Sequence, residues 1–332
     1  MATTWTLDEL GRALGMQELF TRQSPQKLKV LREHALIESA VSSNRIEGVE
    51  VEQSRAGTLI FGAPILRDRD EEEVRGYRSA LELIHTQRSA LAVTPETMQE
   101  LHRLTRGEIW DAGQYKERAE PIIEKYPDGT TRVRFMPVEA GTPTVAAIVE
   151  LTSLWSISQR DKLVHPLVAV GGFVLDFLCI HPFRDGNGRV SRLLLLLLAY
   201  HGGADVGRYI SLERLIEQNK DRYYETLEQS SQGWHEGRHN PWPFVNYVLW
   251  ILKQAYKEFV QRVGETAEPM GAKAQLVRDA IARRQGTFSL GELEAACPGV
   301  GRDWIRQILR KMKADGQVRS FGHGAGSRWE RI

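Results

Sequence analysis

Cysteine is scarce in this chain: only Cys179 and Cys297 occur in 332 residues, far apart in the sequence. Two cysteines cannot build the disulfide framework of a small secreted domain, and Cys179 lies in an apolar run, which is typical of a buried, reduced thiol. The first ten residues, MATTWTLDEL, also lack the basic and apolar regions of a secretory signal. We therefore expect a cytoplasmic protein with free thiols.

The sequence also has little net charge and no apolar run of membrane length. A formal net charge of +1 excludes a whole-chain field that would draw the protein to nucleic acid or to anionic lipid. The most apolar stretch, Leu163 to Ile180, contains His165 and Asp176, whereas a bilayer span needs about 20 mostly apolar residues. This stretch predicts a buried core helix, and we expect no membrane partner.

Apolar residues recur at helical spacing over most of the chain, which predicts a mainly α fold. Helices are expected over 25–47, 70–88, 95–107, 142–160, 163–179, 211–230 and 241–262. Leu193 to Leu198 are apolar on every face, so their helix should be enclosed by others.

Residues 119–138 break the helical pattern. Two short alternating runs flank Pro127-Asp128-Gly129, which predicts a β-hairpin. Its open strand edge could pair with an extended peptide; a surface loop is the alternative.

Beyond a linker over 263–271, the pattern resembles a winged helix. Helices are expected over 272–284, 289–296 and 301–315, followed by a two-stranded tail over 317–332. The third helix carries five basic residues that could face DNA phosphates: Arg302, Arg306, Arg310, Lys311 and Lys313. A solvated basic face, or a protein or dimer contact, is the alternative.

Residues 181–192 read His-Pro-Phe-Arg-Asp-Gly-Asn-Gly-Arg-Val-Ser-Arg and carry the groups that a polyphosphate with Mg²⁺ requires. Gly186 and Gly188 allow positive φ and close approach to a ligand, and the start of the following helix attracts anions. Asp185 is a hard oxygen ligand suited to Mg²⁺. His181 can accept a proton from an attacking hydroxyl.

Three further side chains of this stretch suit phosphate binding. Arg189 and Arg192 are three positions apart and share a helix face, from which guanidinium groups can grip phosphate, and Asn187 can hydrogen-bond a phosphate oxygen. The stretch matches His-x-Phe-x-Asp/Glu-Gly-Asn-Gly-Arg-x-x-Arg at every fixed position. It resembles the signature loop of the Fic (filamentation-induced-by-cAMP) family, and the resemblance covers residues 15–262.

The resemblance implies a helical bundle with a hairpin flap and the activity of a protein adenylyltransferase. AMP would pass from ATP to a Ser, Thr or Tyr hydroxyl of a target protein held on the 119–138 hairpin. It also implies that His181 is the base, that Asp185 holds Mg²⁺ and that Asn187, Arg189 and the loop N–H groups stabilise the phosphates. Arg192 would bind the γ-phosphate.

Residues 43–48 read Ser-Asn-Arg-Ile-Glu-Gly at the end of the first long helix. Gly48 suits the position just past a helix end, and the Glu47 carboxylate there costs about 0.3–1 kcal/mol against the helix dipole. A solvated glutamate is one interpretation. The pattern Ser43-x-x-x-Glu47-Gly48 also resembles the inhibitory helix of Fic proteins, which implies that Glu47 pairs with Arg192 and obstructs ATP. Its place before the signature implies the N-terminally self-inhibited class.

Two weaker motifs remain. Asn219-x-x-x-Tyr223-Tyr224 resembles a Fic segment near the nucleotide base, and core packing is the alternative interpretation. His235-Glu236-x-x-His239 matches a zinc-protease string that requires a helix, but flanking glycines and prolines predict a loop without zinc.

The sequence thus predicts four parts: an N-terminal helical region over 1–90 with the inhibitory helix, a catalytic core over 91–262, the linker and the winged helix over 272–332. Removal of AMP, another phosphoryl or nucleotidyl transfer, or a DNA-binding regulator with a Fic sensor core are the alternative functions. The target protein, self-modification and a homodimer stay open.

Overall fold

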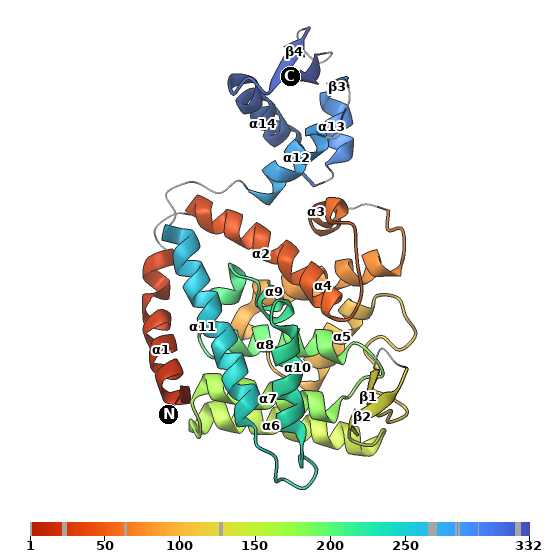
Figure 1. The fold of residues 1–332 in the computed structure, drawn as a ribbon, viewed down its shortest axis with the longest axis vertical. Helices are drawn as coiled ribbons and strands as arrows, with labels where there is room; N and C mark the ends of the chain where they lie inside the picture. The colour runs from red at the N-terminus through yellow and green to blue at the C-terminus, as the bar shows by residue number, and fades with distance from the viewer. Residues whose placement is uncertain are drawn as a thin grey trace.

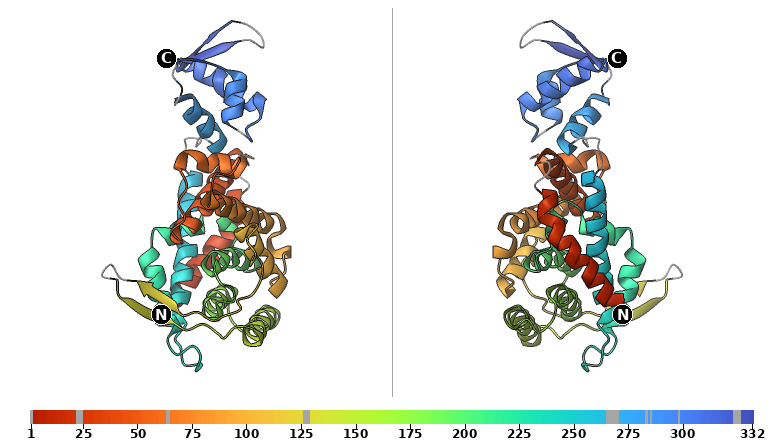
Figure 2. Two further views of the ribbon diagram at one scale, coloured as in Figure 1. Left: turned by 90° about the vertical axis from the view of Figure 1, so that its right-hand side faces the viewer. Right: turned by 90° about the vertical axis from the view of Figure 1, so that its left-hand side faces the viewer.

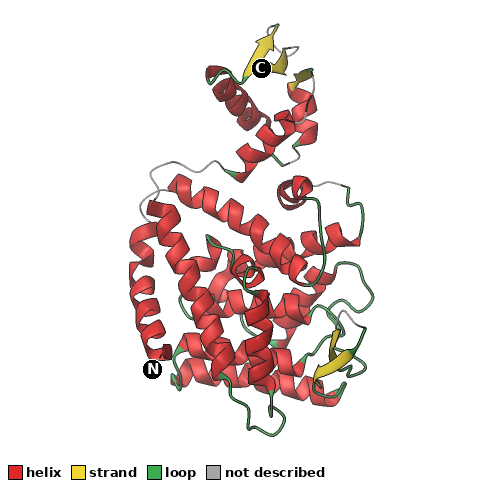
Figure 3. Ribbon diagram, in the orientation of Figure 1, coloured by secondary structure: helices red, strands yellow, loops and turns green. Residues whose placement is uncertain are grey.

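The computed structural model describes residues 2–21, 25–62, 65–125, 129–264, 271–282, 284, 286–297, 299–322 and 327–332. A helical body contains the N-terminus, and a smaller C-terminal unit stands beyond one end of it (Figure 1). Strands occupy two places in the described residues, a hairpin at the side of the body and a small sheet in the C-terminal unit (Figure 3). The prediction of a mainly α fold is confirmed.

The helices of the body are α1 (Ala2–Thr21), α2 (Pro25–Ile46), α3 (Gln53–Phe61), α4 (Arg69–Gln87), α5 (Pro95–Arg106), α6 (Thr142–Asp161), α7 (Pro166–Ile180), α8 (Asn187–His201), α9 (Leu212–Glu217), α10 (Lys220–Ser231) and α11 (Trp242–Gly264). Two short 3₁₀ helices, η1 (Arg88–Ala90) and η2 (Asp205–Arg208), connect them.

Helix α8 forms the centre of the body. It packs against α4, α5 and α7, and Leu193 to Leu198 are all buried, which confirms that this helix is enclosed. Full burial of a leucine side chain is worth about 1.5–3 kcal/mol. The run therefore fixes α8 firmly, and with it the loop of residues 181–186 that precedes the helix.

The structure differs from the expected helices in two ways. The single helix predicted over 211–230 is wrong, because Gln218 and Asn219 separate α9 from α10. Asn219 leaves the helical conformation at φ −127°, ψ 34°, and its side-chain amide donates to the carbonyl of Leu215 at 2.8 Å. Helices α1 and α3 were not anticipated; α1 lies along α11, with Leu10 buried in the common core.

The hairpin pairs β1 (Ile122–Lys125) with β2 (Thr131–Phe135) in antiparallel register, and a β-bulge lies at Ile122/Ile123. Its turn at Pro127 and Asp128 falls outside the described residues. Figure 2 shows the hairpin projecting from the side of the body. On β2, Arg132 Nη2 donates to Glu228 Oε1 on α10 at 2.7 Å, and Arg134 Nη2 lies 3.6 Å from the other carboxylate oxygen. The hairpin is therefore fastened to α10.

The C-terminal unit holds α12 (Ala272–Ala282), α13 (Leu290–Ala296) and α14 (Arg302–Ala314) around strands β3 (Thr287–Ser289), β4 (Val318–Phe321) and β5 (Arg328–Arg331). The strands form one antiparallel sheet in the order β3-β5-β4. This unit has a hydrophobic cluster of its own, which includes Val277, Phe288, Leu293, Leu309 and Val318. The winged helix stays a prediction, and linker residues 265–270 and tail residues 323–326 lie outside the described part.

Helix α12 joins the unit to the body by contacts with α2 and α3. None of the helices in the described residues is both long enough and apolar enough to cross a membrane.

Candidate active site

The loop of residues 181–186 begins where α7 ends. His181 caps α7 in the left-handed conformation, at φ 51° and ψ 61°, which residues other than glycine rarely adopt. Its backbone N–H still donates to Phe177 O at 2.9 Å. Such backbone geometry often accompanies functional sites, and here it turns the imidazole into the same cavity as Glu47 and Arg192.

His181 is held as a neutral base. Its Nδ1 lies 3.2 Å from the carbonyl oxygen of Leu178, an acceptor, so Nδ1 carries the hydrogen and Nε2 keeps its lone pair. Burial lowers the pKa of His181 to about 4. At neutral pH the ring is therefore uncharged, and Nε2 can accept a proton.

Asn187 closes the loop through both polar atoms of its side chain. Its Oδ1 accepts from the N–H of Phe183 at 3.0 Å, and its Nδ2 donates to the carbonyl of the same residue at 2.7 Å. The side chain is buried. The amide therefore holds the loop in shape, and its hydrogen bond to phosphate through the second Nδ2 hydrogen stays a prediction.

Helix α5 and the segment after it support the loop from behind. His102 stacks on Phe183, with ring centroids 3.9 Å apart and planes within 3°, and its Nε2 donates to Asp185 O at 3.0 Å. Its Nδ1 accepts from the N–H of Gly113 at 2.9 Å. Burial lowers the pKa of His102 to about 4. The ring is therefore uncharged at neutral pH, as it must be to donate from Nε2 while accepting at Nδ1.

Lys116 fixes the turn from the other side. Its Nζ donates to the carbonyls of Ile180 and His181 at 2.9 and 2.8 Å, and its N–H donates to Pro182 O at 2.8 Å. These three hydrogen bonds hold the carbonyl groups of Ile180, His181 and Pro182, and so fix the backbone at His181. Burial lowers the pKa of Lys116 to about 8.

Asp185 reaches solvent at the mouth of the loop, with its side chain 59% exposed. Its Oδ2 accepts from Arg106 Nη1 at 2.6 Å, and its Oδ1 accepts from the N–H of Gly186 at 2.6 Å. Burial raises the pKa of Asp185, but the charges of Arg106 and Arg189 outweigh it and leave the pKa below its usual value. The group is a carboxylate at neutral pH.

This donor set fits Mg²⁺ of the kind that accompanies a nucleotide. The described residues hold no cluster of three His, Cys, Asp or Glu side chains able to bind a metal, so the protein offers the ion a single exposed carboxylate. Mg²⁺ usually keeps several waters and takes one or two carboxylates plus substrate phosphates. Asp185 meets that requirement.

Arg189 is buried and is held by the carboxylate of Glu73 on α4. Its Nη1 pairs with Glu73 Oε2 and lies 3.4 Å from Asn44 Oδ1, while its Nη2 lies 3.7 Å from Asp185 Oδ1. Glu73 Oε1 also accepts from Arg69 Nε at 3.1 Å and from Arg106 Nη1 at 3.4 Å. One buried carboxylate therefore positions Arg189 and, through Arg106, Asp185.

Arg192 is held by the end of α2. Its Nε donates to Ser43 Oγ at 2.8 Å, and its Nη2 donates to Ser43 O at 2.9 Å and to Glu47 Oε1 at 2.8 Å. The guanidinium is 2% exposed, whereas the Glu47 side chain is 31% exposed. The ion pair thus lies at the floor of an open cavity.

Gly188 lets the glutamate approach the loop. A Cβ at this position would overlap the Glu47 carboxylate. The absence of a side chain therefore brings Glu47 against the first turn of α8, where backbone N–H groups have no partner within the helix.

The end of α2 has the backbone pattern that presents Glu47. The N–H of Val49 donates to Asn44 O and that of Gly48 donates to Arg45 O, both at 3.0 Å, which together form a Schellman motif. Gly48 adopts φ 85°, as such a motif requires. Gly186 is likewise left-handed, at φ 80°, as the N-cap of α8.

A cavity of about 700 Å³ joins these groups to the hairpin and to α10. Its lining includes Glu47, His181, Arg192, hairpin residues Ile122, Ile123, Arg134 and Phe135, and Tyr223 and Tyr224 of α10. Tyr223 is buried against Phe244 and Tyr247, so Tyr224 is the more accessible ring. Asn219 borders a separate pocket, and its side chain donates to the carbonyl of Leu215 in α9; its place near the nucleotide base stays a prediction.

The string His235-Glu236-x-x-His239 lies in turns between α10 and α11. The His235 ring stacks on Phe135 at 5.4 Å, and its Nε2 lies 2.7 Å from Met136 O. This histidine therefore supports the hairpin.

Four residues of the site were missed by sequence reasoning: Glu73, His102, Arg106 and Lys116. Glu73 follows the acidic first turn of α4, and Arg106 lies in an ordinary basic last turn of α5. No spacing signal links these four residues to the loop, because they meet it only when α4, α5 and the segment after α5 pack against it.

Part of this chain is similar in sequence to proteins of a known family. Residues 92–199 match the Fic/DOC family. The chain is 23% identical over 238 residues to a protein adenylyltransferase Fic of Nematostella vectensis, covering 69% of this chain and 49% of that protein. It is also 23% identical over 240 residues to one of Drosophila yakuba, covering 67% and 43%. The matched region spans about half the length of these relatives.

Solved structures share the fold. A Fic-domain signalling protein of Bacteroides thetaiotaomicron superposes with a TM-score of 0.65 at 21% identity, covering 78% of this chain and all of that one. A Fic family protein of Desulfovibrio desulfuricans superposes with a TM-score of 0.60 at 21% identity, covering 100% of this chain and 96% of that one. Residues 92–199 of the helical body thus match the Fic/DOC family, and the chain shares the fold of these solved Fic proteins.

Proposed function

We propose that this chain is a protein adenylyltransferase that transfers AMP from ATP to a hydroxyl of a protein target and inhibits itself through Glu47. The main support for the proposal is that the neutral His181 and the Glu47–Arg192 ion pair line the same cavity. The relatives named protein adenylyltransferase support the reaction class.

In the proposed reaction, a Ser, Thr or Tyr hydroxyl of the target attacks the α-phosphorus of ATP. The new oxygen–phosphorus bond forms as the bond from that phosphorus to the bridging oxygen breaks, and pyrophosphate leaves. His181 Nε2 takes the hydroxyl proton. Since Nδ1 is turned to Leu178 O, the ring is already oriented for this transfer.

The phosphates would lie over the first turn of α8. Its N–H groups, the positive end of the helix dipole and Arg189 would stabilise the charge of the transition state, where most of the catalysis of phosphoryl transfer arises. Mg²⁺ on Asp185, when bound, would neutralise phosphate charge. Arg106 and Glu73 keep Asp185 and Arg189 oriented toward this place.

Inhibition would follow from the electrostatics of Glu47. Its carboxylate occupies the Arg192 guanidinium that should hold the γ-phosphate and adds negative charge where a triphosphate must enter. The burial of Arg192 lowers its pKa, but the charge of Glu47 outweighs burial and raises the pKa, so the pair stays ionised. ATP would then bind weakly, or in a pose from which the α-phosphate cannot react.

The target would dock on the hairpin. Ile122, Ile123 and Phe135 border the cavity, and strand β1 belongs to a two-stranded sheet with an unpaired edge. An extended segment of the target could pair with that edge and bring its hydroxyl toward His181.

The test is labelling with α-labelled ATP in a cell lysate, followed by mass spectrometry. We expect Glu47→Gly to raise labelling at least tenfold over wild type, and we expect Glu47→Gly combined with Arg192→Ala, or with His181→Ala, to lose that gain. Glu50→Gly is the matched control, because it removes an exposed charge a few residues away and should leave labelling unchanged.

An AMP mass on a defined hydroxyl identifies reaction and target together. Equal labelling by wild type and Glu47→Gly would reject the inhibitory role of Glu47. A different mass addition would assign another nucleotidyl or phosphoryl transfer to the same loop, and loss of AMP from a pre-modified target would assign the reverse hydrolysis.

A further inference from the structure

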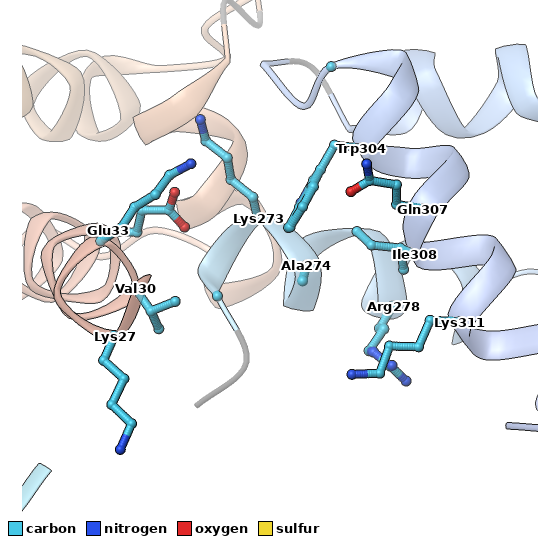
Figure 4. Close-up of a pocket in the computed structure, with 13 residues that line it drawn as sticks. Lys27, Val30, Glu33, Lys273, Ala274, Arg278, Trp304, Gln307, Ile308 and Lys311 are labelled. Atoms are coloured by element: carbon cyan, nitrogen blue, oxygen red, sulfur yellow. The ribbon is translucent and has the colours of Figure 1, made fainter. Parts of the chain in front are cut away.

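A second cavity lies between the first turns of α2 and the C-terminal unit, far along the chain from the loop of residues 181–186 (Figure 4). Its volume is about 520 Å³, within the usual range for small-molecule sites. In Figure 4 its labelled side chains come from α2 on one side and α14 on the other, with α12 between them. The cavity therefore exists only where the C-terminal unit meets the body.

Its lining is strongly cationic. Five basic side chains border it, Lys27, Lys29, Lys273, Arg278 and Lys311, against the single carboxylate of Glu33. Within the described part of the chain, Lys29, Lys273 and Lys311 have no carboxylate partner within 4.0 Å. Gathering like charges in one hollow is unfavourable unless an anion offsets them.

Arg278 contributes a fixed guanidinium group with a hydrogen-bond donor that has no partner within the described ranges. Its Nη1 donates to Gln317 Oε1 at 2.8 Å, which fixes the guanidinium. Its Nε is buried and, among the residues that the structure describes, has no hydrogen-bond partner. A buried donor without a partner costs free energy that a bound acceptor would recover.

Trp304 supplies a flat apolar surface in the same cavity. Its side chain is 41% exposed, although tryptophan is usually well covered. Trp304, Gln307, Ile308 and Lys311 follow one another at helical spacing and share the face of α14 that borders the cavity. Nucleic bases stack on exposed aromatic rings, and nearby lysines neutralise the phosphates. Trp304 and the lysines of this cavity provide both groups.

We propose that this cavity is a binding site for a free nucleotide that carries two or more phosphates. The base would stack on Trp304, and the phosphates would lie among Lys29, Arg278 and Lys311, since the Lys273 ammonium lies over the Phe61 ring at 5.2 Å from its centroid. A small ligand is favoured over duplex DNA, because α2 and α12 wall the cavity opposite α14. Three of the five basic residues expected to face DNA also have partners within the unit: Arg302 lies 3.5 Å from Glu294, Arg306 pairs with Asp303 at 2.9 Å, and Lys313 donates to Ser320 at 2.6 Å.

The test is photolabelling of the full chain with 8-azido-ATP, followed by peptide mapping. We expect label on the α14 peptide that contains Trp304, in addition to any label on residues 221–231 of the proposed active site. Excess inorganic tripolyphosphate should displace the α14 label. Because the two peptides are read separately, failure at one site leaves the result at the other site intact.

Charge reversal then assigns the site to its lysines. We expect Lys29→Glu with Lys311→Glu to lower the α14 label at least tenfold, and Arg310→Glu, which changes an exposed charge on α14 outside the cavity, to leave it unchanged. The proposal is overturned if the α14 peptide is unlabelled, if the label is insensitive to the lysine reversals, or if a 20-base-pair duplex displaces it and tripolyphosphate does not. A circular-dichroism spectrum of the reversed variant confirms that it is folded.

Discussion

Glu73 and Glu47 hold the two arginines of residues 181–192 in different environments. Glu73 is 6% exposed and is surrounded by Arg69, Arg106 and Arg189, so it is a fixed part of the site. Glu47 is more exposed and pairs with Arg192 from a helix end. Release of Glu47 leaves the buried Arg192 guanidinium without its carboxylate, so the proposed block requires another anion, such as a phosphate, to take the place of Glu47.

Replacing Glu73 by Gln in the Glu47→Gly background should lower kcat/KM for ATP at least tenfold, since Arg189 loses its ionic partner and Arg106 no longer anchors Asp185. Breaking a buried pair also costs roughly 3–5 kcal/mol of stability, so Tm is measured alongside. Glu72→Gln is the matched control: this neighbour pairs with Arg69 at the surface. Equal kcat/KM for the two variants would show that Glu73 does not position the site.

At the scale of elements, ion pairs and ring contacts of β2 and the residue after it attach the hairpin to the body. Glu228 on α10 binds both Arg132 and Arg134 of β2, and His235 stacks on Phe135 and contacts Met136 O. Exposed ion pairs contribute only about 0–1 kcal/mol, so a contact of this kind orders the hairpin without adding much to global stability.

Glu228→Ala should therefore speed limited proteolysis of residues 119–138 several-fold and raise the KM for a protein target, while Tm changes by little. Glu225→Ala serves as the comparison, because Glu225 is one turn earlier on α10 and its carboxylate accepts from Gln229. If both variants are cleaved at the wild-type rate, Glu228 does not fasten the hairpin.

The elements show where periodicity succeeds and where it fails. The apolar pattern anticipated α2, α4, α5, α6, α7 and α11 closely. It merged α9 with α10, because the Asn219 break rests on one backbone conformation and one side-chain bond rather than on a proline or glycine. It overlooked α1 and α3, whose stability comes from packing on neighbouring helices.

At the scale of the whole molecule, three histidines kept neutral by burial tie stability to pH. The pKa values of His85, His102 and His181 are lowered to about 4, mainly by burial, whereas histidine in an unfolded chain titrates near about 6.5. Between about pH 6.5 and pH 4, these histidines bind protons in the unfolded state but stay unprotonated in the folded state. Stability is then complete above about pH 6.5 and is lost as the pH falls toward 4.

Urea unfolding at pH 7.5, 6.5 and 5.5 checks this expectation. The free energy of unfolding should change little between the first two values and then fall, with a limiting slope of about 4 kcal/mol per pH unit for three protons. His102→Gln should reduce that slope by about one third. An equal free energy at pH 7.5 and 5.5 would contradict the burial of these rings as neutral groups.

The sequence by itself determined the helical class and the set of candidate groups in residues 181–192, because both are local. Glycine spacing, a helix start and apolar periodicity act over a few residues, and they can be recognised without knowing which segments meet. The same locality explains why Gly48 and Gly186 were correctly expected at backbone turns.

Only the tertiary structure decided which charges face one another. It brought Glu47 to Arg192 and Glu73 to Arg189, turned the Asn187 amide inward, bonded Asn219 to Leu215 and set Lys311 opposite α2. Each of these contacts joins residues on different elements or depends on how buried a side chain is. Coulomb energy and desolvation are set by distance and burial, and neither quantity exists until the helices pack.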